Sequence, residues 1–367
     1  MKHEAPVGVL ISLVALVAMV SVPFLAPHPG PGGDAGTGIV AAAGDAADAA
    51  RDHAHELPVT APHWYVTMHG EGALAQVFAL DGAGKVIGPV LGPLPAGQPA
   101  LDELRGMIAL GDGRLAVMNA KSTASRVLLW GAPDAATGVR PFAGTWTEKN
   151  DANPGMVHPY QIAVGPDGNL YAGNQDTNTV TRYAGLGNSD RGRPLPIPAG
   201  LANFGTLFPG TVVPNDQQSP EGIGLVRGFA FGPDGLLYVC DRGRERVAAY
   251  DPATGRFVRT VLDASHGAKH PIQALFTPDG RHLLVSDNKA NCVFAVNMSS
   301  GRAFELVRKG EGGLDAASSL AIMGKDLYVG SRLGKKILRY ELKDGRFLGV
   351  FAELPSNPEF MVPVAQQ

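Results

Sequence analysis

Short apolar stretches alternate along the chain with turn-forming residues in a fixed order. Three segments, residues 161–174, 228–241 and 273–287, each contain an apolar run, a Pro-Asp-Gly turn and a second apolar run. Proline presets the first dihedral angle of a turn, glycine accepts a positive φ, and Asp bonds to nearby backbone amides. Each segment is therefore predicted to form a β-hairpin.

Further apolar runs extend these hairpins into larger sheets. A third run follows each hairpin, and two of the copies have a fourth. The third runs are residues 180–183, 247–250 and 293–296, and the fourth runs are residues 256–261 and 303–307. Two weaker copies flank the strong ones: residues 104–119 lack the proline, and residues 319–330 have Gly-Lys-Asp in the turn. Residues 63–68 and 75–80 supply the second and third strands of one more copy.

The repeat has the length and strand number of a propeller blade. The turns at Asp234, Asp279 and Gly324 are 45 residues apart, and the larger intervals before them contain the irregular, Pro-rich stretches 132–155 and 187–222. Four antiparallel strands in about 45 residues are typical of one blade of a β-propeller.

Five complete copies and one partial copy predict an all-β, six-bladed β-propeller over residues 61–367. The first copy lacks its first strand, and the C-terminal run 359–364 is the candidate that would complete it and close the ring. Closure also removes the exposed sheet edges of an open array. A seventh blade would need a further copy, and the sequence has none.

The N-terminal region differs from the repeats. Residues 7–25 form an apolar run long enough to span a bilayer. A cleaved signal peptide needs small residues three and one positions before its cleavage site, and Phe24 is bulky at the first candidate site. We expect residues 1–26 to form an uncleaved apolar signal-anchor helix, with a cleaved signal peptide or a buried helix as alternatives. Residues 27–60, rich in Ala, Gly and Pro, are predicted to be a disordered, flexible linker.

This arrangement predicts a propeller on the extracytoplasmic side of a membrane, tethered by the helix, or secreted if that helix is removed. Composition agrees with a turn-rich fold, because 48 Gly and 29 Pro stand beside 45% hydrophobic residues. The formal charge of -3 gives no basic surface for nucleic acid. Cys240 and Cys292 are too few for a disulfide framework or a cysteine-built metal site, so we expect two buried thiols.

The repeat pattern, with Arg227 and Gly228 opening one blade, resembles the NHL-repeat and gluconolactonase-like group of six-bladed propellers, including bacterial proteins similar to virginiamycin B lyase. The resemblance covers residues 63–364. It implies the six-bladed fold. It does not imply one activity, because the architecture hosts lactonases, lyases, hydrolases and non-catalytic binders.

Binding sites of such propellers lie at one end of the central channel, where the inner strands begin. The candidate ligand-binding residues at this channel mouth are Arg105, His158, Tyr160, Gln161, Arg227, His270 and Gln273. Ser318, Ser319 and Glu359 begin the remaining inner strands. Paired guanidiniums suit a carboxylate or phosphate, so Arg105 and Arg227 predict an anion-binding mouth. The alternative role for each arginine is an ion pair with an acid of a neighbouring blade.

The resemblance also implies metal sites, and this sequence departs from them. A gluconolactonase-like metal site uses Asn or Asp residues at later inner strands, where this chain has Arg227, which repels a cation. Glu71, which resembles the first acidic ligand, lies in a turn. His158 and His270 each precede a proline and stand two residues too early for a zinc site like that of an amidating lyase. His266 and His270 lack the aligned acid that lyase-like catalysis requires.

No catalytic site is identified in the sequence, and no cofactor is predicted. The predicted function is binding of a small anionic ligand or a protein partner at the channel mouth. The alternative is a lactonase-like hydrolase or lyase with a nonstandard divalent metal site in the central channel. Four polar residues that follow second strands are expected to cap turns instead of forming a site: Asn119, Asn174, Asp241 and Asp287.

Overall fold

The computed structural model describes residues 64–201, 207–216, 219 and 221–364. The expected signal anchor at residues 1–26 and the linker at residues 27–60 lie outside the described residues. Within the described ranges, no helix has the length and apolar character needed to cross a membrane.

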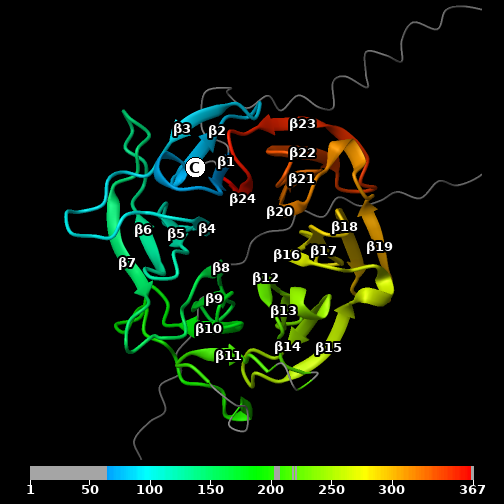
Figure 1. Cartoon of the computed structure of the whole chain (residues 1–367), viewed down its shortest axis with the longest axis horizontal. Coiled ribbons are helices and arrows are strands. Elements are labelled where there is room, and N and C mark those ends of the chain that lie inside the picture. Colours follow the sequence, from blue (N-terminus) through cyan, green and yellow to red (C-terminus); the bar gives the residue numbers. More distant parts are fainter. Residues whose placement is uncertain (1–63, 202–206, 217–218, 220, 365–367) are drawn as a thin grey trace, which may run out of the picture. The chain divides into compact units, whose positions relative to one another are not determined.

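Six sheets of four antiparallel strands surround a common centre (Figure 1), as the repeat predicts. Each sheet is one blade, whose innermost strand is named first and whose outermost strand is named last. Blade 1 consists of β24 (Pro358–Pro363), β1 (Trp64–Met68), β2 (Val77–Leu80) and β3 (Val86–Pro89). Blade 2 consists of β4 (Leu104–Ala109), β5 (Leu115–Asn119), β6 (Arg126–Trp130) and β7 (Phe142–Glu148). Blade 3 consists of β8 (Pro159–Val164), β9 (Leu170–Asn174), β10 (Thr179–Tyr183) and β11 (Thr211–Val213).

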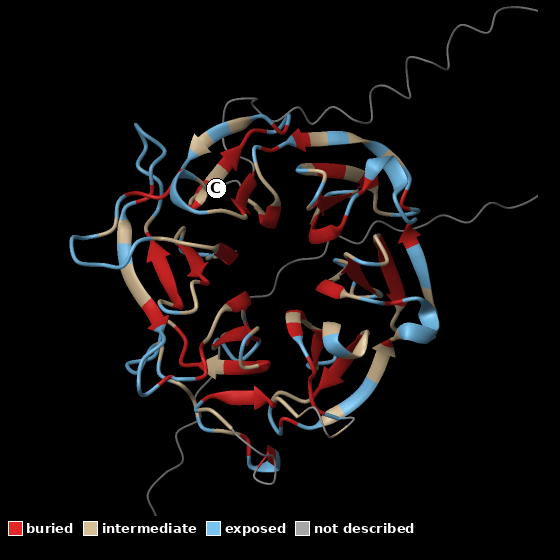
Figure 2. Cartoon of the chain, in the orientation of Figure 1, coloured by how far each residue is buried: buried red, intermediate tan, exposed pale blue. Residues whose placement is uncertain are grey.

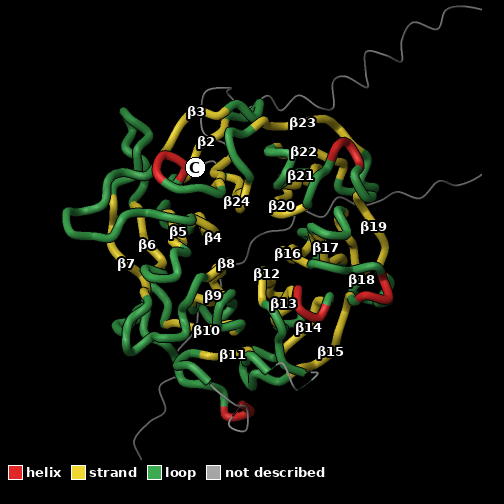
Figure 3. The backbone as a smooth tube through the Cα atoms, viewed as in Figure 1, coloured by secondary structure: helices red, strands yellow, loops and turns green. Residues whose placement is uncertain are grey.

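The second half of the ring has the same organisation. Blade 4 consists of β12 (Val226–Phe231), β13 (Leu237–Asp241), β14 (Arg246–Tyr250) and β15 (Phe257–Leu262). Blade 5 consists of β16 (Pro271–Phe276), β17 (His282–Asp287), β18 (Cys292–Asn297) and β19 (Ala303–Val307). Blade 6 consists of β20 (Ala317–Met323), β21 (Asp326–Ser331), β22 (Lys336–Glu341) and β23 (Phe347–Glu353). Short 3-10 helices occur in the loops (Figure 3): η1 (Gly72–Leu74), η2 (Ala199–Leu201), η3 (Arg242–Arg244), η4 (Ala264–His266) and η5 (Glu311–Gly313).

The two ends of the ring meet in blade 1. The C-terminal strand β24 pairs antiparallel with β1, with Tyr65 opposite Val362 and Val66 opposite Met361. The prediction that the C-terminal run completes the first blade is therefore confirmed. Each inner strand also packs against the inner strands of both neighbouring blades, which holds the ring together at its centre.

The predicted hairpin turns have the expected chemistry. The carboxylates of Asp112, Asp167, Asp234 and Asp279 each accept a hydrogen bond from the backbone amide two residues later, at 3.0–3.2 Å. The glycine after each Asp has a positive φ, between 68° and 84°. Glycine accepts this conformation without the steric cost that a Cβ would bring.

Two outer strands lie where the sequence predicted irregular structure. Strand β7 lies inside residues 132–155, and β11 lies inside residues 187–222. Strand β7 has two buried residues, Trp146 and Thr147, among exposed and partly buried ones, and β11 has three residues, so neither carries a long continuous apolar run. The interpretation of these two stretches as wholly irregular was wrong.

The apolar core lies between adjacent blades, and the outer strands β15, β19 and β23 carry many exposed residues (Figure 2). Cys240 and Cys292 are both buried in the cluster shared by blades 4 and 5, and both thiols are free. Burial raises the pKa of the Cys240 thiol well above its usual range. The prediction of two buried thiols that pack as small apolar side chains is confirmed.

Candidate functional site

A β-bulge begins the inner strand of all six blades. In each blade the pairing with the second strand shifts just after the first paired residue of the inner strand. The first residue in each of these bulges, in order around the ring, is Glu359, Arg105, Tyr160, Arg227, Ile272 or Ser318. A bulge re-aims a side chain relative to a regular strand. We call these six the bulge residues, and the end of the ring where they lie the mouth.

Apolar side chains meet at the centre of the ring. The Tyr160 ring from blade 3 packs edge-to-face on Phe360 from blade 1, with 5.2 Å between the ring centroids. Ile272 from blade 5 belongs to the same buried cluster. Because residues from three alternate blades share one cluster, side chains fill the centre beside the mouth.

Two candidate arginines flank Tyr160. The guanidinium carbon of Arg105 lies 5.9 Å from the centroid of the Tyr160 ring, and that of Arg227 lies 5.8 Å from it. Guanidiniums at this distance from an aromatic ring make cation–π contacts. The structure therefore brings together three of the predicted mouth residues, one from each of blades 2, 3 and 4.

Arg105 is paired with a buried acid. Its Nη1 lies 2.6 Å from Oε2 of Glu359, whose side chain is 1% exposed. The other carboxylate oxygen, Oε1, lies 3.1 Å from Nη2 of Arg332 and 3.2 Å from Nδ1 of His69. Burial by itself would raise the pKa of Glu359, but the His69 hydrogen bond and the charges of Arg105 and Arg332 outweigh it and lower that pKa to about 2. Glu359 is therefore ionised. Arg105 forms an ion pair with an acid of the neighbouring blade, which is the alternative role that the sequence left open for it.

Arg227 has a different environment. Its Nη1 donates to the carbonyl of Val226 at 2.9 Å, and no carboxylate among the described residues lies within ion-pair distance of it. Burial, helped by the charges of Arg242 and Arg105, lowers the pKa of Arg227 to about 10. Arg242, in η3 of the same blade, also has no ion pair to a described carboxylate.

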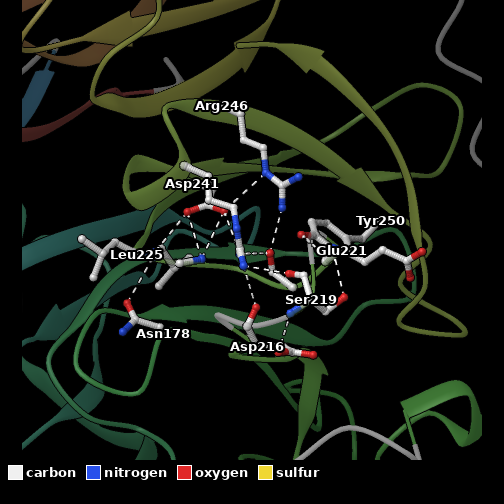
Figure 4. A network of polar contacts seen from close by, with 12 residues as sticks. Asn178, Asp216, Ser219, Glu221, Leu225, Asp241, Arg246 and Tyr250 are labelled. Carbon is white, nitrogen blue, oxygen red and sulfur yellow. Dashed lines mark hydrogen bonds and ion pairs between the residues drawn. The ribbon is translucent and has the colours of Figure 1, made fainter. Parts of the chain in front are cut away.

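Asp241, the last residue of β13, forms no ion pair with Arg227 or Arg242. Asp241 accepts hydrogen bonds from the amides of Gly224 and Leu225, each at 3.0 Å, and pairs with Arg244 and Arg246 (Figure 4). Arg246 also donates to the Gly222 carbonyl at 2.8 Å. This network binds the segment before β12 to the blade, and both carboxylate oxygens of Asp241 take part in it.

The two candidate glutamines bind backbone of the next blade. Nε2 of Gln161 donates to the Phe229 carbonyl at 2.8 Å, and Oε1 accepts from the Phe229 amide at 3.2 Å. Oε1 of Gln273 accepts from the Leu320 amide at 2.7 Å. Gln161 thus joins blade 3 to blade 4, and Gln273 joins blade 5 to blade 6.

The two candidate histidines lie apart from the Glu359 cluster. Nε2 of His158 lies 3.1 Å from Glu103 of blade 2, and Nδ1 lies 3.1 Å from Asp176 of blade 3, so this imidazole bridges two blades. The backbone amide of His270 donates to Asp287. Burial and the charges of Arg242 and Lys289 lower the pKa of His270.

Three of the four residues predicted to cap turns, each the last residue of a second strand, accept from backbone amides: Asn119, Asp241 and Asp287. The fourth, Asn174, instead donates to the Thr181 hydroxyl at 2.9 Å. Asn119 accepts from the Asp102 amide at 2.7 Å, and Asp287 accepts from the amides of Lys269 and Ala290 at 2.7 and 2.8 Å. In the described ranges, no three His, Cys, Asp or Glu side chains are grouped so as to hold a metal ion. Two surface hollows, of about 380 and 480 Å³, lie on blade 3 beside Pro194 and Asp167, and neither is lined by a bulge residue.

His69 and Arg332 are site residues that the sequence did not reveal. Both lie in loops between a second and a third strand, His69 after β1 and Arg332 after β21. Neither loop belongs to the part of the repeat that carries a recognisable turn motif. Arg242 lies in the corresponding loop of blade 4, so the loops on this end of the ring add cations to those on the inner strands.

No protein-family model and no curated protein sequence matches this chain. Solved structures match it in fold. A protein of unknown function from Bacteroides caccae aligns with a TM-score of 0.53 at 14% identity, over 83% of this chain and 100% of that chain. A chain of a nidogen–laminin complex aligns with a TM-score of 0.55 at 13% identity, over 84% of this chain and 100% of that chain. Virginiamycin B lyase from Staphylococcus aureus aligns with a TM-score of 0.45 at 14% identity, over 71% of this chain and 73% of that chain. At such low identity the likeness is one of fold, and the propeller group suspected from the repeat fits it.

Proposed function

We propose that this propeller binds a small anionic ligand at its mouth, with Arg227 as the principal contact. The observation that carries the proposal is the contrast between two arginines at the same place in the repeat. Arg105 has Glu359 as its counter-ion, and Arg227 has no carboxylate partner among the described residues.

The charges around Tyr160 favour an anion. Tyr160 feels the charges of Arg105, Arg227 and Arg332, and Arg227 feels those of Arg105 and Arg242. Against these guanidiniums stands the single carboxylate of Glu359 at Tyr160 and Arg227. A partly buried guanidinium loses hydration without gaining a counter-ion, which is unfavourable. An anionic ligand would restore charge-assisted hydrogen bonds to Arg227, and such bonds are among the stronger ones in proteins.

The proposal is tested by calorimetric titration of the full-length protein with small anions at low ionic strength. We expect binding to the wild-type protein and a loss of about tenfold or more in affinity in Arg227→Ala, since a charge-assisted bond contributes about 1.5–3 kcal/mol. Arg259→Ala is the matched control, because Arg259 lies on the outer strand β15, away from the mouth, and pairs with Asp234. Unchanged affinity in Arg227→Ala, or no binding of any anion, would overturn the proposal.

We also propose that residues 1–26 tether the propeller to a membrane through the linker at residues 27–60, with the propeller on the extracytoplasmic side. The length of the apolar run at residues 7–25 supports this. Carbonate-washed membranes should retain the full-length protein. Release of a mature form that lacks residues 1–26 would instead identify a cleaved signal peptide.

A further inference from the structure

The internal repeat supplies two copies of the same arginine site. Arg105 and Arg227 occupy the bulge position of blades 2 and 4, and a glycine follows each. Both glycines are needed because the next blade is close. A Cβ on Gly106 would lie 2.9 Å from the Ile162 amide nitrogen, and one on Gly228 would lie 2.6 Å from the Ile272 carbonyl oxygen. The two guanidiniums then lie beside one aromatic ring, that of Tyr160.

The two copies differ in what the preceding blade contributes. For Arg105, the bulge residue of the preceding blade is Glu359, which places a carboxylate 2.6 Å from the guanidinium. For Arg227, the bulge residue of the preceding blade is Tyr160, which has no negative charge. The phenol of Tyr160 has no hydrogen-bond partner among the described residues. The site in blade 4 thus has Arg227 where blade 2 has Arg105, but it has no carboxylate where blade 2 has Glu359 beside it.

We propose that the anion bound at Arg227 is a carboxylate, held by the guanidinium as Glu359 is held by Arg105. This inference rests on the proposed function and narrows its ligand to one chemical class. In the Arg105 copy the guanidinium contacts one carboxylate oxygen, with Nη1 2.6 Å from Oε2 of Glu359, and Arg227 keeps N–H donors beyond the Nη1 that bonds to Val226. Tyr160, whose ring centroid lies 5.8 Å from the Arg227 guanidinium carbon, adds a neutral O–H donor. Burial, followed by the charge of Glu359, raises the pKa of Tyr160, so its phenol keeps its proton.

The test compares carboxylates with tetrahedral anions on the full-length protein. Acetate and benzoate are titrated against inorganic phosphate and sulfate at constant ionic strength and neutral pH. We expect the two carboxylates to bind, and phosphate and sulfate to bind about tenfold more weakly or not at all. Phosphate or sulfate binding as tightly as the carboxylates would overturn this inference and leave the proposed anion-binding function intact. Failure of all four anions to bind would overturn both.

Two conservative variants separate the contacts. Arg227→Lys keeps the charge and loses the planar guanidinium that lies beside the Tyr160 ring, so carboxylate affinity should fall about tenfold, whereas the matched change Arg259→Lys should leave it unchanged. Tyr160→Phe keeps the ring and removes the phenol, and a fall of about fivefold is expected for one neutral hydrogen bond. Circular dichroism and thermal unfolding confirm that each variant is folded. Equal carboxylate affinity in Arg227→Lys and the wild-type protein would contradict the proposed binding geometry.

Discussion

Oε2 of Glu359 lies 2.6 Å from Nη1 of Arg105, and this ion pair joins the last strand of the chain to the second blade. The same carboxylate contacts Arg332 of blade 6 and His69 of blade 1. Blades 6, 1 and 2 are consecutive around the ring, and blade 1 is where the two ends of the propeller meet. One buried carboxylate therefore ties together the blades on both sides of the closure.

Glu359→Gln should destabilise the propeller strongly. The amide keeps the volume of the side chain but removes the charge that faces Arg105, Arg332 and His69. Breaking a buried ion pair by removing one partner costs about 3–5 kcal/mol. Denaturant unfolding measures the change, with Glu353→Gln as the control, since Glu353 pairs with Lys336 on the surface and should contribute about 0–1 kcal/mol. A loss in Glu359→Gln no larger than that in the control would contradict the role of the carboxylate in ring closure.

The same residue predicts how stability depends on pH. The pKa of Glu359 is lowered from 4.5 to about 2 on folding, so its contribution to stability is complete above about pH 5 and is lost as the pH falls toward 2. A shift of this size corresponds to about 3 kcal/mol. Unfolding measured between pH 6 and pH 2.5 should show a steeper loss in the wild-type protein than in Glu359→Gln. Parallel curves for the two proteins would mean that Glu359 is not the group that titrates.

Gln161→Ala should lower the free energy of unfolding by removing the hydrogen bonds between blades 3 and 4 that Gln161 makes. The change leaves the amide and the carbonyl of Phe229 without their partner at a buried position. Each buried polar group left unsatisfied costs about 1–3 kcal/mol, so a loss of about 2–4 kcal/mol in the free energy of unfolding is expected. Gln161→Glu is an informative companion, because one oxygen would still accept from the Phe229 amide while the other would face the Phe229 carbonyl oxygen. It should destabilise the protein at least as much as Gln161→Ala does, since a buried carboxylate would lack a donor. Wild-type stability in Gln161→Ala would show that the glutamine is free for another role.

The fold could be predicted from the sequence because its signals are local. Each Pro-Asp-Gly turn lies between two strands that pair with each other, so a short stretch around Asp167, Asp234 or Asp279 contains the whole hairpin. The outer strands β7 and β11 could not be found in this way. Each of them pairs with a single strand of its sheet; β7 is largely exposed or half-buried, and β11 is buried but has only three residues, so neither carries a long apolar run.

The site could be predicted in part. The repeat correctly places Arg105, Tyr160 and Arg227 at the starts of inner strands, and their proximity follows from the ring. The repeat cannot tell the two arginines apart, because each is followed by glycine and opens a blade. The difference between them lies in the preceding blade, and for Arg105 that partner is Glu359 at the opposite end of the sequence.

Replacing each arginine by methionine tests whether Arg105, which has a carboxylate partner, and Arg227, which has none among the described residues, contribute differently to stability. Arg105→Met removes the closest partner of Glu359, and a loss of about 2 kcal/mol or more in the free energy of unfolding is expected because a buried charge loses a counter-ion. Arg227→Met removes a guanidinium that has no described carboxylate partner and keeps an unbranched apolar stem beside Tyr160. The pKa of Arg227, lowered to about 10, means that its charge opposes folding at every pH below that value.

Arg227→Met should therefore match the wild-type stability or exceed it by about 1 kcal/mol, as is common when a residue kept for binding is replaced. Parallel denaturant unfolding of the two variants at neutral pH, in buffer free of small carboxylates, measures both changes. Adding benzoate should then raise the stability of the wild-type protein and leave that of Arg227→Met unchanged, because a ligand stabilises only the state that binds it. Equal destabilisation by the two substitutions would show that Arg227 has a structural role like that of Arg105, and would remove the main support for an anion site at the mouth.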